Sequence, residues 1–318
     1  MRVLAPFGKR AVVGIITEIG PDSNIESSKL KPLKRLLDSE PTITPNILSL
    51  CLWAIQYYHH NPGEVFQNAL PLALRNENIS ALEFVTTWQV TTKGQLISLT
   101  QLARAPKQVE ALHVLRDHPN GLTQAVLSGL NIKSASLRAL KDKGLADTLE
   151  QLNSYPSWTK DSPLKEASLQ LNNQQQQATD AIAKNNVSVL TPFLLEGVTG
   201  SGKTEVYLQV IEKSLRNGKQ ALILVPEIGL TPQTLHRFQQ RFNVPVLAIH
   251  SNLTANQRLA AWRQSKAGSA AIIIGTRSAL FTPMKSPGII IVDEEHDLSY
   301  KQQDGFRYSA RDMAIVRA

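Results

Sequence analysis

A glycine-rich loop joins an apolar run to a helix-forming segment near the middle of the chain. Gly197, Gly202, Lys203 and Thr204 fit the pattern G-x-x-x-x-G-K-[ST]. Glycines let such a loop turn several backbone N–H groups toward one point, and the N-terminus of the following helix adds positive potential there. We therefore expect Lys203 to reach the β- and γ-phosphates of a nucleotide and the Thr204 hydroxyl to bind Mg²⁺. The loop residues expected to contact the nucleotide are Gly197, Val198, Thr199, Gly200, Ser201, Gly202, Lys203 and Thr204.

An acidic stretch follows an apolar run near the end of the chain. It reads Gly-Ile-Ile-Ile-Val-Asp-Glu-Glu-His over residues 288–296. A buried strand would deliver these carboxylates at its C-terminal end, where open α/β sheets place their sites. We expect Asp293 to hold Mg²⁺ and Glu294 to act as general base toward the attacking water. His296 follows two residues later, a position suited to relay the nucleotide state to a bound polymer.

The elements that position both stretches alternate between strand and helix from Leu169 onward. We expect helices at 172–184, 203–216, 232–242, 254–266 and 276–281. We expect strands at 193–196, 220–225, 246–249, 271–274 and 288–292. Continuous apolar strands such as Ala-Ile-Ile-Ile indicate a parallel sheet that is covered on both faces. The fold class of this region is therefore α/β, a P-loop parallel-sheet domain.

The first 104 residues predict a small β-rich domain with a helical end. Strands are expected at 2–5, 11–19 and 31–37, and Thr44-Pro45 opens a helix that ends before Asn61. Residues 81–104 have no clear periodicity and predict a linker. Adjacent histidines at 59 and 60 point in different directions on a helix, which disfavours a metal site. The aromatic residues at 53, 57 and 58 are expected to pack under the β-rich domain rather than stack on bases.

A compact pattern from Pro106 to Leu149 predicts a winged-helix module. It combines three short helices, the third of which begins at Ser134, with a strand-like tail at 145–149. Four basic residues on or beside the third helix could contact phosphates: Lys133, Arg138, Lys141 and Lys143. A solvated basic face without a ligand explains them equally well.

Composition favours a polyanionic partner in a reducing compartment. The 318 residues include 34 Lys+Arg and 26 Asp+Glu, which gives a net charge of +8, and the pI is about 9.5. Cys51 is the single cysteine, so the chain can form neither an internal disulfide nor a cysteine-based zinc site. No secretory signal and no stretch long enough to span a membrane occurs, so the cytoplasm is the expected location and no membrane partner is expected.

Three further segments follow expected strands and suit nucleic acid. Residues 226–233 and 275–281 offer hydroxyls, a basic group and helix N-termini for a phosphate backbone. Residues 299–308 alternate aromatic and basic side chains, a composition suited to stacking on single-stranded bases. Each segment alone could be an ordinary loop, but together they favour a DNA motor over a soluble metabolic kinase.

Several of these stretches together resemble one family. Gly-Val-Thr-Gly-Ser-Gly-Lys-Thr-Glu-Val-Tyr, Val-Pro-Glu-Ile-Gly-Leu-Thr-Pro-Gln, Ile-Gly-Thr-Arg-Ser-Ala-Leu-Phe-Thr-Pro and Asp-Glu-Glu-His look like the PriA family. These are the primosomal replication-restart helicases of bacteria, also called primosomal protein N′, in helicase superfamily 2. The likeness extends through Ser-Tyr-Lys-Gln-Gln-Asp-Gly-Phe-Arg-Tyr and the N-terminal Val-Leu-Ala-Pro-Phe-Gly-Lys, Leu-Asp-Ser-Glu-Pro and Tyr-Tyr-His-His.

The resemblance implies an order of domains. A 3′-DNA-end-binding β-rich domain would cover 1–104, a winged helix 105–152, a linker 153–170 and the first RecA-like helicase lobe 171–318. Gln175 falls at the family's adenine-side motif, and Lys203, Thr204, Asp293 and Glu294 would carry the chemistry of ATP and Mg²⁺. The residues that the resemblance and the loop chemistry assign to DNA are Gly8, Lys31, Arg277, His296, Tyr300, Lys301, Phe306, Arg307 and Tyr308. The loop from Tyr300 to Tyr308 would couple DNA binding to ATP hydrolysis.

The chain also departs from the family pattern. The family begins earlier and continues into a cysteine-rich zinc-binding insert, a second RecA lobe and a C-terminal domain, so we expect a fragment in which the zinc ligands are absent. An arginine from the second lobe would complete the ATP site, a contribution worth roughly 10³–10⁵ in rate. We therefore expect the fragment to bind ATP weakly and to hydrolyse it slowly.

Three functions follow as hypotheses. The first is an ATP-dependent 3′→5′ DNA helicase that recognises stalled forks and D-loops, with branched and single-stranded DNA, PriB, DnaT and single-strand-binding protein as partners implied by the resemblance. The second is a fork-binding DNA module without ATPase activity of its own. The third is another superfamily 2 translocase, such as a RecG-like or restriction-type motor, which the N-terminal likeness disfavours.

Overall fold

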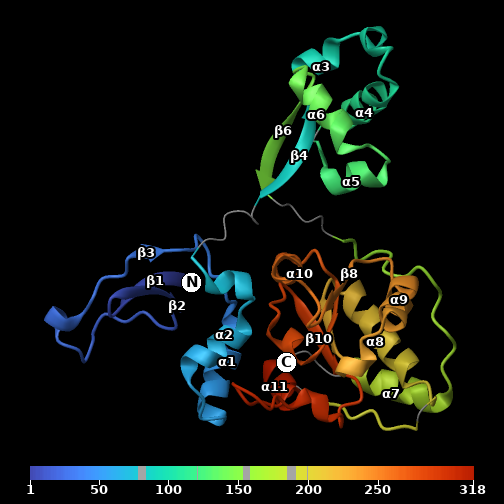
Figure 1. Cartoon of the computed structure of the whole chain (residues 1–318). Helices are drawn as coiled ribbons and strands as arrows, with labels where there is room; N and C mark the ends of the chain where they lie inside the picture. Colours follow the sequence, from blue (N-terminus) through green and yellow to red (C-terminus); the bar gives the residue numbers. More distant parts are fainter. Residues whose placement is uncertain (78–83, 120, 153–157, 185–190, 199) are drawn as a thin grey trace. The chain divides into compact units, whose positions relative to one another are not determined.

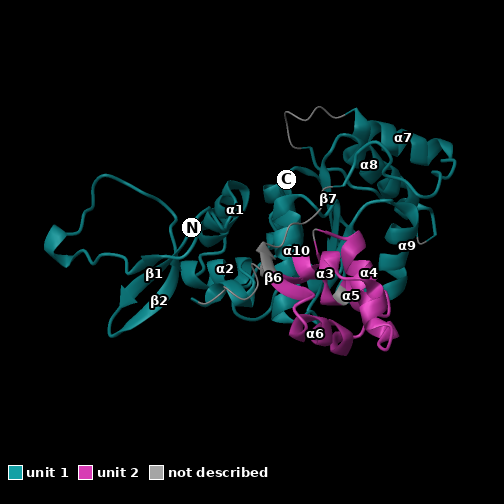
Figure 2. Cartoon of the chain, turned by 90° about the horizontal axis from the view of Figure 1, so that it is seen from above, with its two compact units in different colours: residues 1–77, 155–318 teal, residues 78–154 magenta. Residues whose placement is uncertain are grey.

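A computed structural model describes residues 1–77, 84–119, 121–152, 158–184, 191–198 and 200–318 of the chain. The chain divides into two compact units, one formed by Met1–Glu77 with Tyr155–Ala318 and the other by Asn78–Ser154. Figure 1 shows the elements and Figure 2 colours the two units. The first unit contains an antiparallel sheet and a parallel sheet, and the second contains a separate three-stranded sheet.

The N-terminal sheet of the first unit has the order β2-β1-β3 and is antiparallel. β1 covers Arg2–Phe7, β2 covers Arg10–Ile15 and β3 covers Arg35–Leu36. Gly8 forms the turn between the first two strands with φ of +58°, a conformation that favours glycine. The strands expected at 11–19 and 31–37 are shorter than predicted, because pairing with β1 ends at Ile15 and includes two residues of β3. A single 3₁₀ turn, η1 (Ser27–Lys29), lies in the long connection.

A buried ion pair anchors the start of β1. Arg2 is 3% exposed, and its Nε donates to Oδ1 of Asp38 at 2.9 Å while its Nη1 donates to the carbonyl of Leu74 at 3.1 Å. Thr42 donates a further hydrogen bond to Asp38. Burial raises the pKa of the Asp38 carboxyl, but hydrogen bonds from Arg2 and Thr42 outweigh burial and hold this pKa below its usual value. The pair therefore ties β1 to η2 (Leu72–Arg75).

Asp38→Asn tests this anchor. At pH 7 we expect the variant to lose about 2 kcal/mol of unfolding free energy, the size of a hydrogen bond to a charged group. Because the folded-state pKa of Asp38 is lowered, its contribution is complete above the unfolded value of about 4 and is lost as the pH falls through the folded value. Urea unfolding of both proteins between pH 7 and pH 3 measures the difference. A difference that stays constant below about pH 4 would contradict the assignment.

Two helices follow the small sheet. α1 (Pro45–Tyr57) has proline at its first position, as expected from Thr44-Pro45, and the Asn61 side chain caps α2 (Pro62–Ala69). The two helices contact each other, and α1 also contacts the last helix of the chain, α11 (Ala310–Arg317). Nδ2 of Asn46 donates to the carbonyl of Arg317 at 3.2 Å across this contact. Cys51 is fully buried in α1, and burial raises the pKa of its thiol to about 12.

The second unit is a winged helix that begins earlier than predicted. β4 (Phe84–Val90) pairs with both β5 (Leu122–Thr123) and β6 (Ala146–Leu152), and the register runs from Phe84 opposite Leu152 to Val90 opposite Ala146. The expectation of a linker over 81–104, and of a domain boundary after residue 104, is therefore wrong for the described residues. The β-branched and aromatic residues of 84–90 suit a strand, but its partner lies about sixty residues further along the chain. Residues 78–83 lie outside the described part.

Helices surround the core of this second unit. They are α3 (Thr92–Leu96), the 3₁₀ turn η4 (Leu99–Leu102), α4 (Pro106–Asp117), α5 (Gln124–Gly129) and α6 (Ser134–Asp142). Leu112, Leu115, Leu127, Leu137 and Leu140 are all fully buried in one cluster with Trp88 of β4. The three helices and the terminal strand predicted between residues 106 and 149 are confirmed.

The parallel sheet of the first unit has the order β10-β7-β9-β8. Its strands are β7 (Gln220–Leu224), β8 (Val246–Ile249), β9 (Ile272–Gly275) and β10 (Pro287–Val292). The strand expected at 193–196 does not form, and the side chains of Phe193 and Leu194 are exposed, so this apolar run gains no burial. β10 is half-buried rather than buried as expected, because β7 is its strand partner and its other edge is unpaired among the described residues.

Four helices contact the strands of this sheet: α8 (Lys203–Arg216), α9 (Pro232–Arg241), α10 (Ala255–Ala267) and α11. A further helix, α7 (Asn173–Ala183), packs against α8. Side chains of α8 and α9 form one core with Ala221 and Ile223, while Leu222 and Leu224 are buried on the other side. The helix expected at 276–281 is the 3₁₀ helix η6 (Arg277–Phe281). In the described part of the chain, no helix has the length and apolarity needed to cross a membrane.

Candidate nucleotide and DNA site

The glycine-rich loop turns into helix α8 at Lys203, as the sequence pattern predicts. Gly200 and Gly202 both have φ of +83°, and Gly202 is the N-cap of the helix. The ammonium of Lys203 donates to the carbonyl of Gly197 at 2.5 Å, so it lies over the loop. The first N–H groups of a 14-residue helix are free of helical partners, and together with this ammonium they offer phosphate both donors and positive potential. Thr199 lies outside the described residues.

Gln175 reaches the same loop from helix α7. Its side chain completes a capping box with Asn172, and its Nε2 donates to the carbonyl of Ser201 at 2.9 Å. Gly202 leaves the room for this contact, because a Cβ at that position would clash with Nε2 of Gln175. The structure therefore brings the predicted adenine-side residue directly to the predicted phosphate loop. One N–H and one lone pair of the Gln175 amide stay available for a ligand.

Asp293 and Glu294 leave the C-terminal end of β10 toward this loop. The Asp293 amide donates to the carbonyl of Leu224 at 2.9 Å, which continues the sheet by one residue. Burial, and then the neighbouring Glu294 charge, raise the pKa of Asp293, while Lys203 counteracts them. Glu294 has φ of +45°, an unfavourable conformation for a residue with a side chain, and such strain concentrates at functional sites. Its Oε2 lies 3.8 Å from Nε2 of His296.

Tyr207 joins the two halves of the site, although the sequence motifs give it no role. Its hydroxyl donates to Oγ1 of Thr204 at 3.2 Å, and it lies close enough to the Asp293 carboxylate for each group to affect the pKa of the other. Burial raises the pKa of Tyr207 to about 12, so the hydroxyl keeps its proton. Tyr207 lies one helical turn after Thr204, and that spacing on α8 was the available signal.

Tyr300 supports the acidic turn rather than presenting itself to DNA. It ends the 3₁₀ turn η7 (Leu298–Tyr300) and is 3% exposed. Its hydroxyl donates to the carbonyls of Asp293 at 2.6 Å and Leu224 at 2.9 Å. Burial raises its pKa well above the usual range. A ring held in this way is not available for stacking on a base.

The rest of the aromatic loop is also packed inward. Phe306 and Tyr308 are 1% and 3% exposed, and their ring centroids lie 4.8 Å apart. Tyr58 and His60, from the end of α1 and the turn after it, contact Phe306 with centroids at 6.0 and 5.3 Å. In this structure the three aromatic residues predicted to stack on bases are therefore in the protein core. Lys301 and Arg307 of the same loop are exposed.

Arg277 holds this loop from the neighbouring strand end. Its Nη1 donates to the carbonyls of Ser299 at 2.8 Å and Lys301 at 3.2 Å. These two hydrogen bonds use Nη1 of Arg277, and contact of its guanidinium with a phosphate backbone stays a prediction. His296 is exposed beside the acidic turn, and Gly8 and Lys31 are exposed in the N-terminal sheet region.

The basic residues of the winged helix divide into two groups. Lys133 and Arg138 are exposed on and before α6. Lys141 pairs with Asp147 at 2.9 Å, and Lys143 donates to Oε1 of Gln108 at 2.7 Å. The contacts of Lys141 and Lys143 within the module therefore agree in part with the alternative that these basic residues form a structural face without a ligand. Among the described residues, no cluster of three or more His, Cys, Asp or Glu side chains could hold a metal ion.

Three family models match successive parts of the chain. Residues 1–71 match the 3′ DNA-binding domain (3′BD) of PriA, and residues 85–148 match the primosomal protein N′-like winged helix. Residues 172–317, which contain the phosphate loop and the acidic turn, match the DEAD/DEAH box helicase family. The fold and these matches therefore define a DEAD/DEAH box helicase domain that follows a 3′ DNA-binding domain and a winged helix.

Whole-chain relatives narrow this class. The chain is 44% identical to the replication restart protein PriA of Haemophilus influenzae over 100% of its own length and 43% of the relative. It is 31% identical to the PriA protein of Bacillus subtilis, with 100% and 48% covered, and 34% identical to that of Chlamydia pneumoniae, with 96% and 41% covered. The chain belongs to the PriA family of replication restart proteins. It spans less than half the length of these relatives.

Proposed function

We propose that this chain comprises the DNA-binding domains and the first RecA-like lobe of an ATP-dependent 3′→5′ DNA helicase. The helicase would restart replication at stalled forks and D-loops. One observation carries the proposal. Gln175 contacts Ser201 of the phosphate loop, and Asp293 of the acidic turn lies close enough to Lys203 and Tyr207 of α8 for both residues to affect its pKa. A binding module without an ATP site would not need these three elements to meet.

The residues present fit ATP and Mg²⁺. Thr204 and Asp293 come from different elements, yet the Tyr207 hydroxyl bonds to Thr204 and lies near Asp293, so a hard cation could take both as ligands. Such a cation, when bound, would offset the charge of the β- and γ-phosphates. Lys203 would donate to the same phosphates, and Glu294 would accept a proton from the attacking water. A zinc site belongs to the resemblance alone, and we assign no zinc ligand in this chain.

The DNA side of the proposal rests on the first two domains. The 3′ DNA-binding domain would receive a free 3′ end near Gly8 and Lys31, and the winged helix would contact duplex phosphates through Lys133 and Arg138. The aromatic loop would couple the two sites, since Tyr300 bonds to Asp293 while Phe306 contacts the end of α1. Single-strand-binding protein, PriB and DnaT are the partner proteins that the resemblance implies, and the cytoplasm is the proposed location.

Binding of forked DNA with different 3′ ends tests this function. We expect the protein to bind a fork with a free 3′-OH leading-strand end more tightly than the same fork with a 3′-phosphate. The difference should be about tenfold, corresponding to one to two lost hydrogen bonds in a pocket. Fluorescence anisotropy with labelled forks measures both affinities. Equal affinities would instead support another superfamily 2 translocase that ignores the leading-strand end.

Tyr207→Phe tests the link between the two candidate metal ligands. The variant keeps the ring in the core and removes the hydroxyl, so we expect an unchanged fold. Affinity for an ATP analogue in Mg²⁺ should fall about three- to tenfold, the value of one hydrogen bond, with no change in EDTA. Titrations in Mg²⁺ and in EDTA separate an effect of Tyr207 on the bound cation from an effect on the phosphate loop. An equal loss in both conditions would mean that Tyr207 acts on the phosphate loop rather than on the cation.

A further inference from the structure

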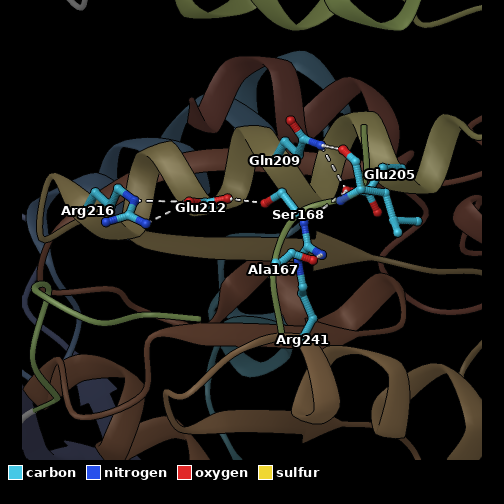
Figure 3. A network of polar contacts seen from close by, with 8 residues as sticks. Ala167, Ser168, Glu205, Gln209, Glu212, Arg216 and Arg241 are labelled. Carbon is cyan, nitrogen blue, oxygen red and sulfur yellow. Dashed lines mark hydrogen bonds and ion pairs between the residues drawn. The ribbon is translucent and has the colours of Figure 1, made fainter. Parts of the chain in front are cut away.

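A buried ion pair lies close to the phosphate loop. The roles proposed above for ATP and Mg²⁺ binding do not involve it. Glu205 is two residues beyond Lys203 on α8, and Arg241 is the last residue of α9. Nη2 of Arg241 lies 2.9 Å from Oε1 of Glu205, and the two side chains are 7% and 10% exposed. Figure 3 shows the pair within a network of polar contacts along α8. Burial of two charges costs desolvation free energy, so net stabilisation alone does not account for an ion pair at this buried position.

The pair forms hydrogen bonds with the backbone of the segment 163–169, which we call the strap. Oε1 of Glu205 accepts from the Leu169 amide at 3.2 Å, and Nη1 of Arg241 donates to the Ala167 carbonyl at 2.6 Å. Gln209 donates to the Leu169 carbonyl at 2.8 Å. It also donates to Glu205 at 2.9 Å (Figure 3). The carbonyl of Arg241 also accepts from the Lys165 amide. Two helices of the lobe thereby fix the path of the strap.

The strap leads directly to Gln175. Three residues after Leu169, Asn172 caps α7, and the capping box fixes Gln175 relative to Asn172. Gln175 then contacts Ser201 of the phosphate loop. The anchored Leu169 and the anchored Gln175 are thus the two ends of one short segment, and a shift of the first end would move the second.

The charges add a second effect. Glu205 lies in the first turn of α8, where the positive end of the helix would attract phosphate. A carboxylate without a partner there would weaken this attraction. Arg241 pairs with this carboxylate from α9, and its Nη1 donates to the Ala167 carbonyl.

We propose that Glu205 and Arg241 are positioning residues that hold Gln175 against the phosphate loop and thereby set the preference of the site for adenine. The inference rests on the proposed ATP function. The free N–H and lone pair of the Gln175 amide match the acceptor and donor on the adenine edge. Guanine presents a second acceptor in place of that donor, so a correctly placed Gln175 disfavours it.

Separate titrations with an ATP derivative and a GTP derivative measure this preference. The purified 318-residue protein is titrated with N-methylanthraniloyl derivatives of both nucleotides in Mg²⁺, and the ratio of the two dissociation constants is recorded. The wild type should favour ATP. Arg241→Met should weaken both nucleotides, because Glu205 loses its partner, and should reduce the ratio about three- to tenfold, the value of one placed hydrogen bond. Glu205→Gln should reduce the ratio without weakening the binding of GTP.

Two further measurements make the test decisive. Lys213→Met removes an exposed charge on the same helix and should leave the ratio unchanged within about twofold, because substitutions of exposed side chains have small effects. Circular dichroism establishes the fold of each variant, and Glu205→Gln decides the outcome if Arg241→Met does not fold. A wild-type ratio retained by the folded variants, or a wild type without preference for ATP, overturns the inference. A wild type that binds neither nucleotide overturns the proposed function, and the inference with it.

Discussion

Lys203→Ala is expected to abolish nucleotide binding at ordinary concentrations while the fold and DNA binding stay intact. The ammonium lies over the phosphate loop, where it would form charge-assisted hydrogen bonds to two phosphates. Each such bond is worth about 1.5–3 kcal/mol, so affinity for ATP should fall at least about 100-fold. The side chain is not part of the core, and thermal stability should therefore be unchanged.

Isothermal titration with ATP and Mg²⁺ measures this loss. Lys213→Ala is the matched control, since Lys213 is exposed on the same helix ten residues later. We expect the control to keep wild-type affinity. Fork affinity, measured in parallel, should be equal in all three proteins. ATP binding that survives Lys203→Ala would show that the loop is not a phosphate site and would favour a DNA module without an ATP site.

Phe306→Ala should cause a large loss of stability, greater than that expected for Asp38→Asn. The ring is 1% exposed and contacts Tyr58, His60, Phe281 and Tyr308, which come from three separate parts of the chain. Truncation of a fully buried phenylalanine costs about 3–5 kcal/mol through lost transfer energy and the cavity left behind. We expect the cost to fall on the first unit, because all these contacts lie within it.

Urea unfolding, followed by hydrogen exchange to separate the two units, measures this cost. Phe7→Ala serves as the control because Phe7 is 74% exposed in the N-terminal sheet, and it should change stability by less than about 0.5 kcal/mol. Exchange should accelerate in α1 and in the aromatic loop of the Phe306 variant and stay unchanged in the winged helix. A Phe306 variant as stable as the Phe7 variant would mean that the aromatic cluster opens readily.

The parts of the site that depend on local pattern could be predicted from the sequence. The phosphate loop is followed by a helix that begins at Lys203, because the loop glycines and the capping geometry are encoded within a few residues. Gln175 and Asn172 form a capping box for the same reason. Asp293 and Glu294 follow an apolar strand whose length and composition are local features.

The parts that depend on distant partners could not be predicted in this way. β4 pairs with β6 across a span that contains most of the winged helix, so its sequence alone predicted a linker. Tyr300, Phe306 and Tyr308 have the composition of a base-stacking loop, and their burial follows from contacts with Asp293 and with the end of α1. The Glu205–Arg241 pair joins two helices whose relative placement no local pattern specifies.

The coupling of the two sites is the central claim, and one measurement tests it most directly. The dissociation constant of an ATP analogue is measured with the protein alone and with the protein saturated by a fork that carries a free 3′ end. If the loop from Tyr300 to Tyr308 links Asp293 to α1, DNA should change nucleotide affinity by about fivefold or more, and ATP should change DNA affinity by the same factor. Identical nucleotide affinity with and without bound DNA would contradict the claim and leave two independent sites on one chain.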